Sequence, residues 1–322
     1  MHVSGPAQTI LGEVRTSLLP ESAALSRGSA AELVTLAHGK PVRSRERPVS
    51  WAQSPVIAEG IDCRLAVSSR KAPRVVGAVA ARATVVGGRV LQSTAQCSVV
   101  GAPINRRQSW EYYMGRVGVA EVVTRLTPDL DSDIALNFLA PTNPEVETFD
   151  PGAIAARVTT RVRRNPMLDQ RPPLQTESTR LRWSARVVAG SDPSVTMTLC
   201  DNELRTAAVV VGDTDLLSGV ADFCEDLARH DWLLTVLTEV IDEAEMSQFS
   251  HTPVEQVISP MLEHLVRLWM PSKGTPRRLR GLWTALQYDP GFDQQWKAQV
   301  DHLRDRLSVA TLTALKRSHQ SW

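Results

Sequence analysis

The sequence has few cysteines and none of the segments that direct a chain to or across a membrane. Its 322 residues include four cysteines, and no two lie close enough for a zinc-knuckle or redox pair. We therefore expect free thiols in a reducing, cytoplasmic environment. Residues 1–19 include Glu13 and Arg15 and lack the apolar stretch of a secretory signal. Because no apolar run reaches about 18 residues, we predict no membrane-spanning helix.

Catalytic and cofactor-binding motifs are also missing. The sequence contains no Gly-x-Ser-x-Gly nucleophile motif and no Ser-x-x-Lys in a plausible setting. Gly87 and Gly88 lack the Lys-Ser/Thr of a phosphate-binding loop and precede an expected strand rather than a helix. We therefore predict no catalytic residue and no cofactor.

Charge is unevenly distributed, although the formal net charge is only +1. Residues 1–110 hold 14 Lys/Arg against 6 Asp/Glu, whereas residues 213–263 hold 12 acidic residues and one basic residue, Arg229. Such asymmetry indicates either two parts that attract each other or charged faces that await a partner. We expect the two parts to dock, with apolar burial supplying most of the stability and charge supplying orientation.

Hydrophobic periodicity predicts an α+β protein. We expect a β-rich N-terminal half, a small antiparallel meander at 181–211 and a C-terminal helical bundle. The expected division is a β-rich region at 1–137, a Pro-rich connection with a short helix at 138–180, and the meander plus bundle at 181–322.

Several local signals place the individual elements. Residues 10–18 read as a strand, and Gly87-Gly88 as a tight hairpin turn within 74–100. Ser29 and Glu32 match a capping box for a helix over 30–38, and Asp150-Pro151 match the start of another helix. One apolar stripe over 216–244 predicts a long helix, and further helices are expected from Thr252, after Pro276 and after Pro290.

His230 and Asp231 form the most suggestive pair. A His-Asp dipeptide on a helix is the core of a metal-dependent phosphohydrolase signature, but that chemistry needs further ligands. The only upstream histidines are His2 and His38. The alternative is a core histidine hydrogen-bonded to Asp226 on the same helix face, and it is the interpretation we favour.

A basic run is the second candidate, spanning the expected start of the helix after Pro276. The helix dipole disfavours cations at a helix start, so the cluster suggests capture of phosphate, nucleic-acid backbone or an acidic partner. The alternatives are docking against the acidic helix, or a solvated face. A similar run at 157–164 has the same open interpretations. The candidate residues are Lys273, Arg277, Arg278 and Arg280.

Three segments resemble an uncharacterised family of conserved actinobacterial, streptomycete-type proteins. They are residues 12–20 (GEVRTSLLP), 86–93 (VGGRVLQS) and 223–234 (FCEDLARHDWLL). The resemblance implies a component of a multi-protein system that includes a degenerate P-loop protein and a methyltransferase-like protein. It implies no activity and supplies no catalytic residues.

These observations predict a non-enzymatic protein-interaction component, with a nucleotide-binding protein as its candidate partner. The first alternative is nucleic-acid or phosphate binding through the Arg clusters. The second is a metal-dependent phosphohydrolase at His230 and Asp231. The sequence leaves the partner and the oligomeric state open.

Overall fold

The computed structural model describes residues 9–68, 72–104, 106–140, 148–246 and 264–320. It confirms the α+β class: a ten-stranded sheet carries helices on both faces. The strands are β1 (Thr9–Leu18), β2 (Arg43–Arg45), β3 (Trp51–Gln53), β4 (Ile57–Arg64), β5 (Arg74–Val86), β6 (Val90–Gly101), β7 (Val119–Val122), β8 (Thr179–Val187), β9 (Ser194–Leu199) and β10 (Leu204–Val211). The helices are α1 (Arg27–Leu33), α2 (Trp110–Met114), α3 (Pro128–Leu139), α4 (Pro151–Arg163), α5 (Thr214–Met246), the 3-10 turn η2 (Arg277–Leu279), α7 (Gly281–Tyr288) and α8 (Phe292–Gln320).

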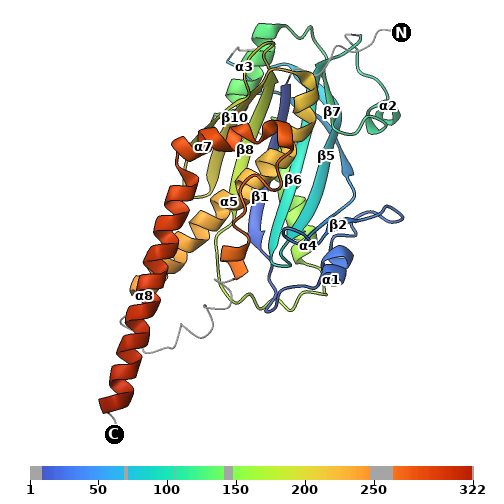
Figure 1. The fold of residues 1–322 in the computed structure, drawn as a ribbon. Helices are drawn as coiled ribbons and strands as arrows, with labels where there is room; N and C mark the ends of the chain where they lie inside the picture. Colours follow the sequence, from blue (N-terminus) through green and yellow to red (C-terminus); the bar gives the residue numbers. More distant parts are fainter. Residues whose placement is uncertain (1–8, 69–71, 105, 141–147, 247–263, 321–322) are drawn as a thin grey trace.

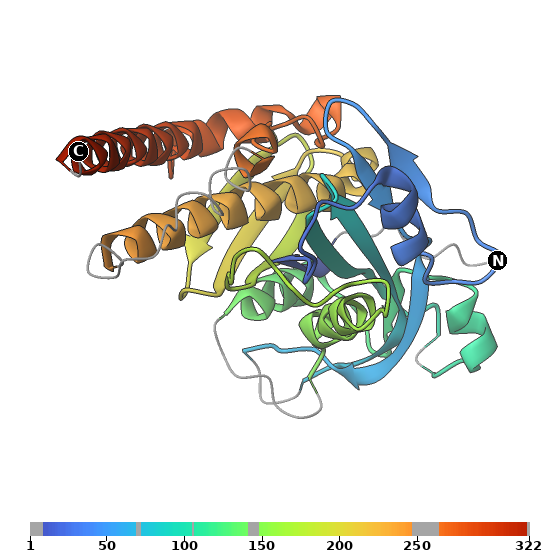
Figure 2. The same cartoon turned by 90° about the horizontal axis from the view of Figure 1, so that it is seen from below.

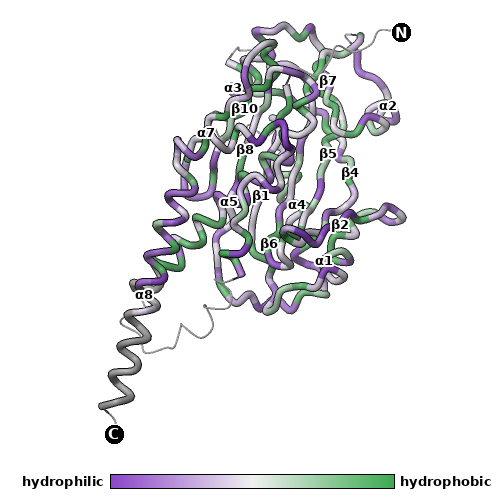
Figure 3. Tube along the Cα trace, in the orientation of Figure 1, coloured by the Kyte–Doolittle hydropathy of each residue, from purple (hydrophilic) through white to green (hydrophobic). Residues whose placement is uncertain are grey.

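The helices form two layers (Figures 1 and 2). Helices α3 and α4 cover one face of the sheet, where α4 packs on β1, β5 and β6. The long helix α5 lies on the other face against β1, β8 and β10, and α8 packs on α5. The central strands carry both hydrophobic and hydrophilic residues, and the short strand β2 is hydrophilic (Figure 3). No helix in the described ranges combines the length and apolar character needed to cross a bilayer.

Strand β1 joins the two β-rich parts of the chain. It pairs antiparallel with β6 on one side, where Thr9 lies opposite Val99, and antiparallel with β8 on the other. The strand order is β2-β3-β5-β7-β6-β1-β8-β10-β9, with β4 paired to β5. The β-rich segments on either side of 138–180 therefore belong to one continuous sheet.

The meander predicted at 181–211 is wrong in its pairing. Strand β10 pairs with β8 in parallel and inserts between β8 and β9, and β9 pairs only with β10 among the described strands. The reason is burial: Ala207, Val209 and Val211 lie in the same core as Trp183, under α5, whereas β9 is largely exposed. Alternation of apolar and polar residues identifies a strand but does not identify its neighbours. The sequence therefore left the order of β8, β9 and β10 in the sheet open.

Most of the local predictions are confirmed. Both Gly87 and Gly88 have positive φ in the β5–β6 turn. The Asp150 side chain accepts a hydrogen bond from the backbone amide of Ala153 at the start of α4. The capping box at Ser29 is wrong, because α1 starts earlier and Ser26 is its N-cap. The helix expected from Thr252 begins outside the described residues.

Candidate anion-binding site

His230 lies on α5 and has no exposed surface. Its Nδ1 is 2.7 Å from the carbonyl oxygen of Asp226, and its Nε2 is 3.1 Å from the amide nitrogen of Met270. Because an amide can only donate, Nε2 accepts and the ring proton sits on Nδ1. Trp269 and Trp283 meet the ring edge-on. Both ring nitrogens are therefore engaged, which favours the core-histidine interpretation.

Asp231 has a different set of partners from His230. Its Oδ2 forms an ion pair with Nε of Arg205 at 2.6 Å. Burial raises the pKa of Asp231 to about 6, despite the opposing effect of Arg205. Within the described part of the chain, no three His, Cys, Asp or Glu side chains gather to hold a metal ion. The geometry therefore gives the metal-dependent phosphohydrolase hypothesis no support.

The predicted basic run lies in the loop before α7 and in η2. Lys273, Arg277, Arg278 and Arg280 are all exposed, and Leu279 between them is buried against α5. Their backbone groups form local hydrogen bonds, such as that from the Lys273 amide to the Met270 carbonyl, but none of the four side chains forms a hydrogen bond or ion pair with another described residue. Docking of these cations against the acidic helix is therefore not seen in the described structure. The second run is partly used internally, since Arg157 pairs with Glu59 at 2.7 Å.

The acidic residues of α5 instead pair with a strand arginine that the sequence analysis did not single out. Arg82 of β5 donates to Glu225 at 2.7 Å and to Asp222 at 2.6 Å. Thr94 and Gln92 of β6 add hydrogen bonds to the side chain and the backbone carbonyl of Glu225. The expected contact between the basic N-terminal part and the acidic helix is thus present, and it is partly buried.

A cavity of about 240 Å³ lies beside this contact. Strand residues Gln53, Thr84 and Gln92 line it from the sheet, and α5 contributes its acidic residues and Arg229. Arg43 and Arg45 line it from β2, and Lys273 lines it from the loop after residue 268. The cavity thus brings one member of the predicted basic run next to two arginines that lie about 230 positions earlier in the chain.

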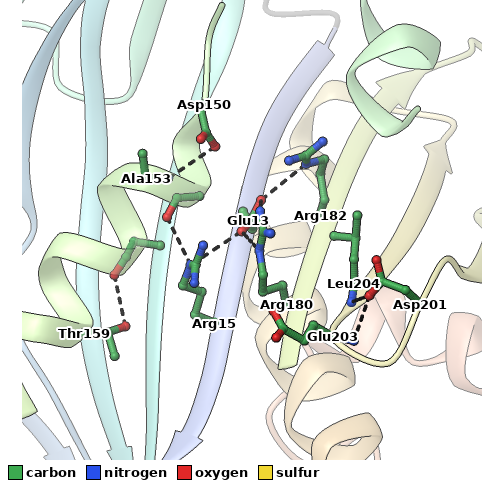
Figure 4. Close-up of polar contacts among 12 residues, drawn as sticks. Glu13, Arg15, Asp150, Ala153, Thr159, Arg180, Arg182, Asp201, Glu203 and Leu204 are labelled. Carbon is green, nitrogen blue, oxygen red and sulfur yellow. Dashed lines mark hydrogen bonds and ion pairs between the residues drawn. The ribbon is translucent and has the colours of Figure 1, made fainter. Parts of the chain in front are cut away.

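A second charged cluster lies on the opposite face of the sheet (Figure 4). Glu13 of β1 has no exposed surface, and its carboxylate receives hydrogen bonds from Arg180 at 2.8 Å and Arg182 at 3.3 Å. Arg15 lies 3.7 Å from the same carboxylate and donates to the carbonyl of Gly152 at the start of α4. A Cβ on Gly152 would come within 2.3 Å of the Glu13 carboxylate, so the helix start is already filled by this side chain.

The charges of the Glu13 cluster are compensated within the chain. Asp150 and Glu203 lie close enough to stabilise the charged form of Arg180. Three carboxylates therefore balance the three arginines. Two charged residues within one strand, Glu13 and Arg15, were the available sequence signal. The other two partners of Glu13 come from β8, which the sequence did not place beside β1.

The chain was compared with models of protein families, with curated proteins and with solved structures, and none of them matches it. The assignment of a functional site therefore rests on geometry.

Replacing Glu13 with glutamine should lower the free energy of unfolding by about 3 kcal/mol, because it leaves the buried Arg182 and the half-buried Arg15 and Arg180 without their carboxylate. Urea denaturation measures this change. The matched control is Glu59→Gln, which removes an exposed pair worth no more than about 1 kcal/mol. Equal small losses in both variants would show that the Glu13 cluster is not a major source of stability.

Replacing His230 with glutamine should have a pH-dependent cost. Burial and the neighbouring Arg229 hold the pKa of His230 well below its usual 6.5, so the folded protein keeps the ring neutral. Below that pH the unfolded chain gains a proton that the folded chain excludes, and the stability of the wild type falls. The difference in free energy of unfolding between the wild type and His230→Gln should therefore shift by about 1 kcal/mol against the wild type as the pH falls from about 7.5 to about 5.5. Asp226 and Asp231 are present in both proteins, so their contributions to the pH dependence of stability largely cancel in the difference. A difference in free energy of unfolding that does not change with pH would contradict the account.

Proposed function

We propose that this chain is a non-enzymatic interaction component that binds an acidic surface of a partner protein through its basic run. The observation that carries the proposal is that all four cations, Lys273, Arg277, Arg278 and Arg280, are exposed and lack ion-pair partners among the described residues. The acidic side chains of α5 that line the cavity already pair with Arg82 and Arg229. A partner's carboxylates would supply what the chain itself does not.

Apolar and aromatic side chains on the neighbouring elements support a protein partner. Tyr288, at the end of α7, is 87% exposed, and Leu199 of β9 is 64% exposed. Helix α7 packs against β9, so these elements share one side of the molecule (Figure 1). Arginine and tyrosine are both enriched at protein interfaces, and Arg and Tyr anchors often dominate their binding energy.

The overall charge favours a protein over nucleic acid as the partner. Nucleic-acid-binding domains commonly have an isoelectric point above about 9, whereas this chain has a value of about 7.8 and a net charge of +1. Following the resemblance described above, we expect the partner to be a nucleotide-binding protein of the same actinobacterial multi-protein system, in the cytoplasm. The nucleic-acid alternative remains an outcome of the test below.

The test is affinity purification of the full chain from its native cells, followed by mass spectrometry. The variant Arg277→Glu/Arg278→Glu should reduce recovery of the partner at least tenfold, because each acidic contact becomes repulsive. The matched control is Arg163→Glu/Arg164→Glu, which reverses two exposed charges at the end of α4, on the other face of the sheet. The control should retain the partner.

Nuclease treatment of the same samples separates the alternatives. A partner that persists after nuclease and disappears only in the Arg277/Arg278 variant supports a protein interface. Loss on nuclease treatment would replace the proposal with nucleic-acid binding. Undiminished recovery by the Arg277/Arg278 variant would overturn the role of the basic run.

A further inference from the structure

The cavity beside α5 is built from three separate parts of the chain. The sheet forms its floor through Gln53, Thr84 and Gln92, which are at most 9% exposed. The β2–β3 hairpin forms one wall, with Arg43, Arg45 and Trp51. Helix α5 and the loop at 270–274 form the other. A polar floor and a tryptophan wall suit a ligand that has both hydrogen-bonding and flat apolar parts.

The carboxylates that line this cavity are already neutralised by internal partners. Asp222 and Glu225 share the guanidinium of Arg82. Asp226 pairs with Arg229 and accepts a hydrogen bond from the Thr275 hydroxyl at 2.9 Å. These acids therefore have little remaining capacity to attract a cationic ligand.

The cations around the cavity are less well satisfied. Arg43, Arg45 and Lys273 are exposed, and none of their side chains has a hydrogen-bond or ion-pair partner in the ranges that the structure describes. Arg229 is only 9% exposed, and its Nε has no hydrogen-bond partner there. A buried donor without a partner is costly, so its presence beside a cavity points to a ligand or ordered solvent. With Arg82 included, five cations face three carboxylates, which leaves two positive charges without compensation.

We propose that this cavity binds a small organic phosphate monoester. A phosphate monoester carries a charge of about −1.5 to −2 at pH 7, which matches the uncompensated charge. Its oxygens pair with Lys273 and the two β2 arginines, since guanidinium groups bind phosphate in a bidentate manner. The organic part lies toward Trp51 and the amide groups of Gln53 and Gln92. This site shares only Lys273 with the proposed partner surface, because Arg277, Arg278 and Arg280 do not line the cavity.

Isothermal titration calorimetry of the full chain with phenyl phosphate tests this inference. We expect saturable binding that is tighter than that of inorganic phosphate, because the ring adds contact with Trp51. Benzenesulfonate has a similar shape but a single charge, and it should bind at least threefold more weakly than phenyl phosphate. Lys273→Met and Arg45→Met should each weaken binding about tenfold, equivalent to about 1.4 kcal/mol.

Arg278→Met is the matched control, because it removes an exposed cation five residues from Lys273 that does not line the cavity. It should leave phenyl phosphate binding unchanged. Equal losses in Arg278→Met and Lys273→Met would show a diffuse surface effect and overturn the inference. Absence of saturable binding of phenyl phosphate at millimolar concentration would also overturn it. Neither result would bear on the partner surface, which the Arg277/Arg278 charge reversal tests separately.

Discussion

Glu13 lies in the strand that joins the two parts of the sheet, and its buried carboxylate is surrounded by three arginines. Two of these, Arg180 and Arg182, come from β8, and the third, Arg15, ties β1 to the start of α4. A buried carboxylate is tolerated only when it is paired and hydrogen-bonded, so these contacts specify which strand lies beside β1. The pairing of β1 with β8 then places β10 and α5. The α5 face of the sheet, and the cavity on it, therefore depend on a charge cluster on the opposite face.

The distribution of charge on the α5 face follows from how the acidic helix is neutralised. Arg82, Arg205 and Arg229 pair with the buried or half-buried acids of α5. The Arg82 and Arg205 pairs connect the sheet to the helix, and the Arg229–Asp226 pair lies within α5 itself. None of the three uses the basic residues of β2 or of the loop before α7. The remaining cations are therefore available for external anions. The partner surface and the phosphate cavity that we propose both draw on this surplus.

The sequence predicted those features that local chemistry determines. The Gly87-Gly88 turn, the Asp150 cap of α4 and the apolar stripe of α5 depend on neighbouring residues, and all three are present. The parallel pairing of β8 with β10 depends on contacts between distant segments, and period-2 alternation carries no information about it. The cavity was missed for the same reason, because β2, β3 and the loop at 270–274 meet only in the folded chain. The basic run was correctly placed at a helix start, but Lys273 alone shares the cavity.

The central claim is that β1 makes the sheet one cooperative unit rather than two domains joined by a linker. Native-state hydrogen exchange of the full chain tests it most directly. Amides of β6, β1 and β8 should exchange through openings with the same free energy, and that free energy should depend on denaturant concentration in the same way for all three strands. The reason is that these amides become exposed only when the whole sheet unfolds. Exchange of β8 and β10 through an opening of clearly lower free energy than that of β5 and β6 would contradict the account.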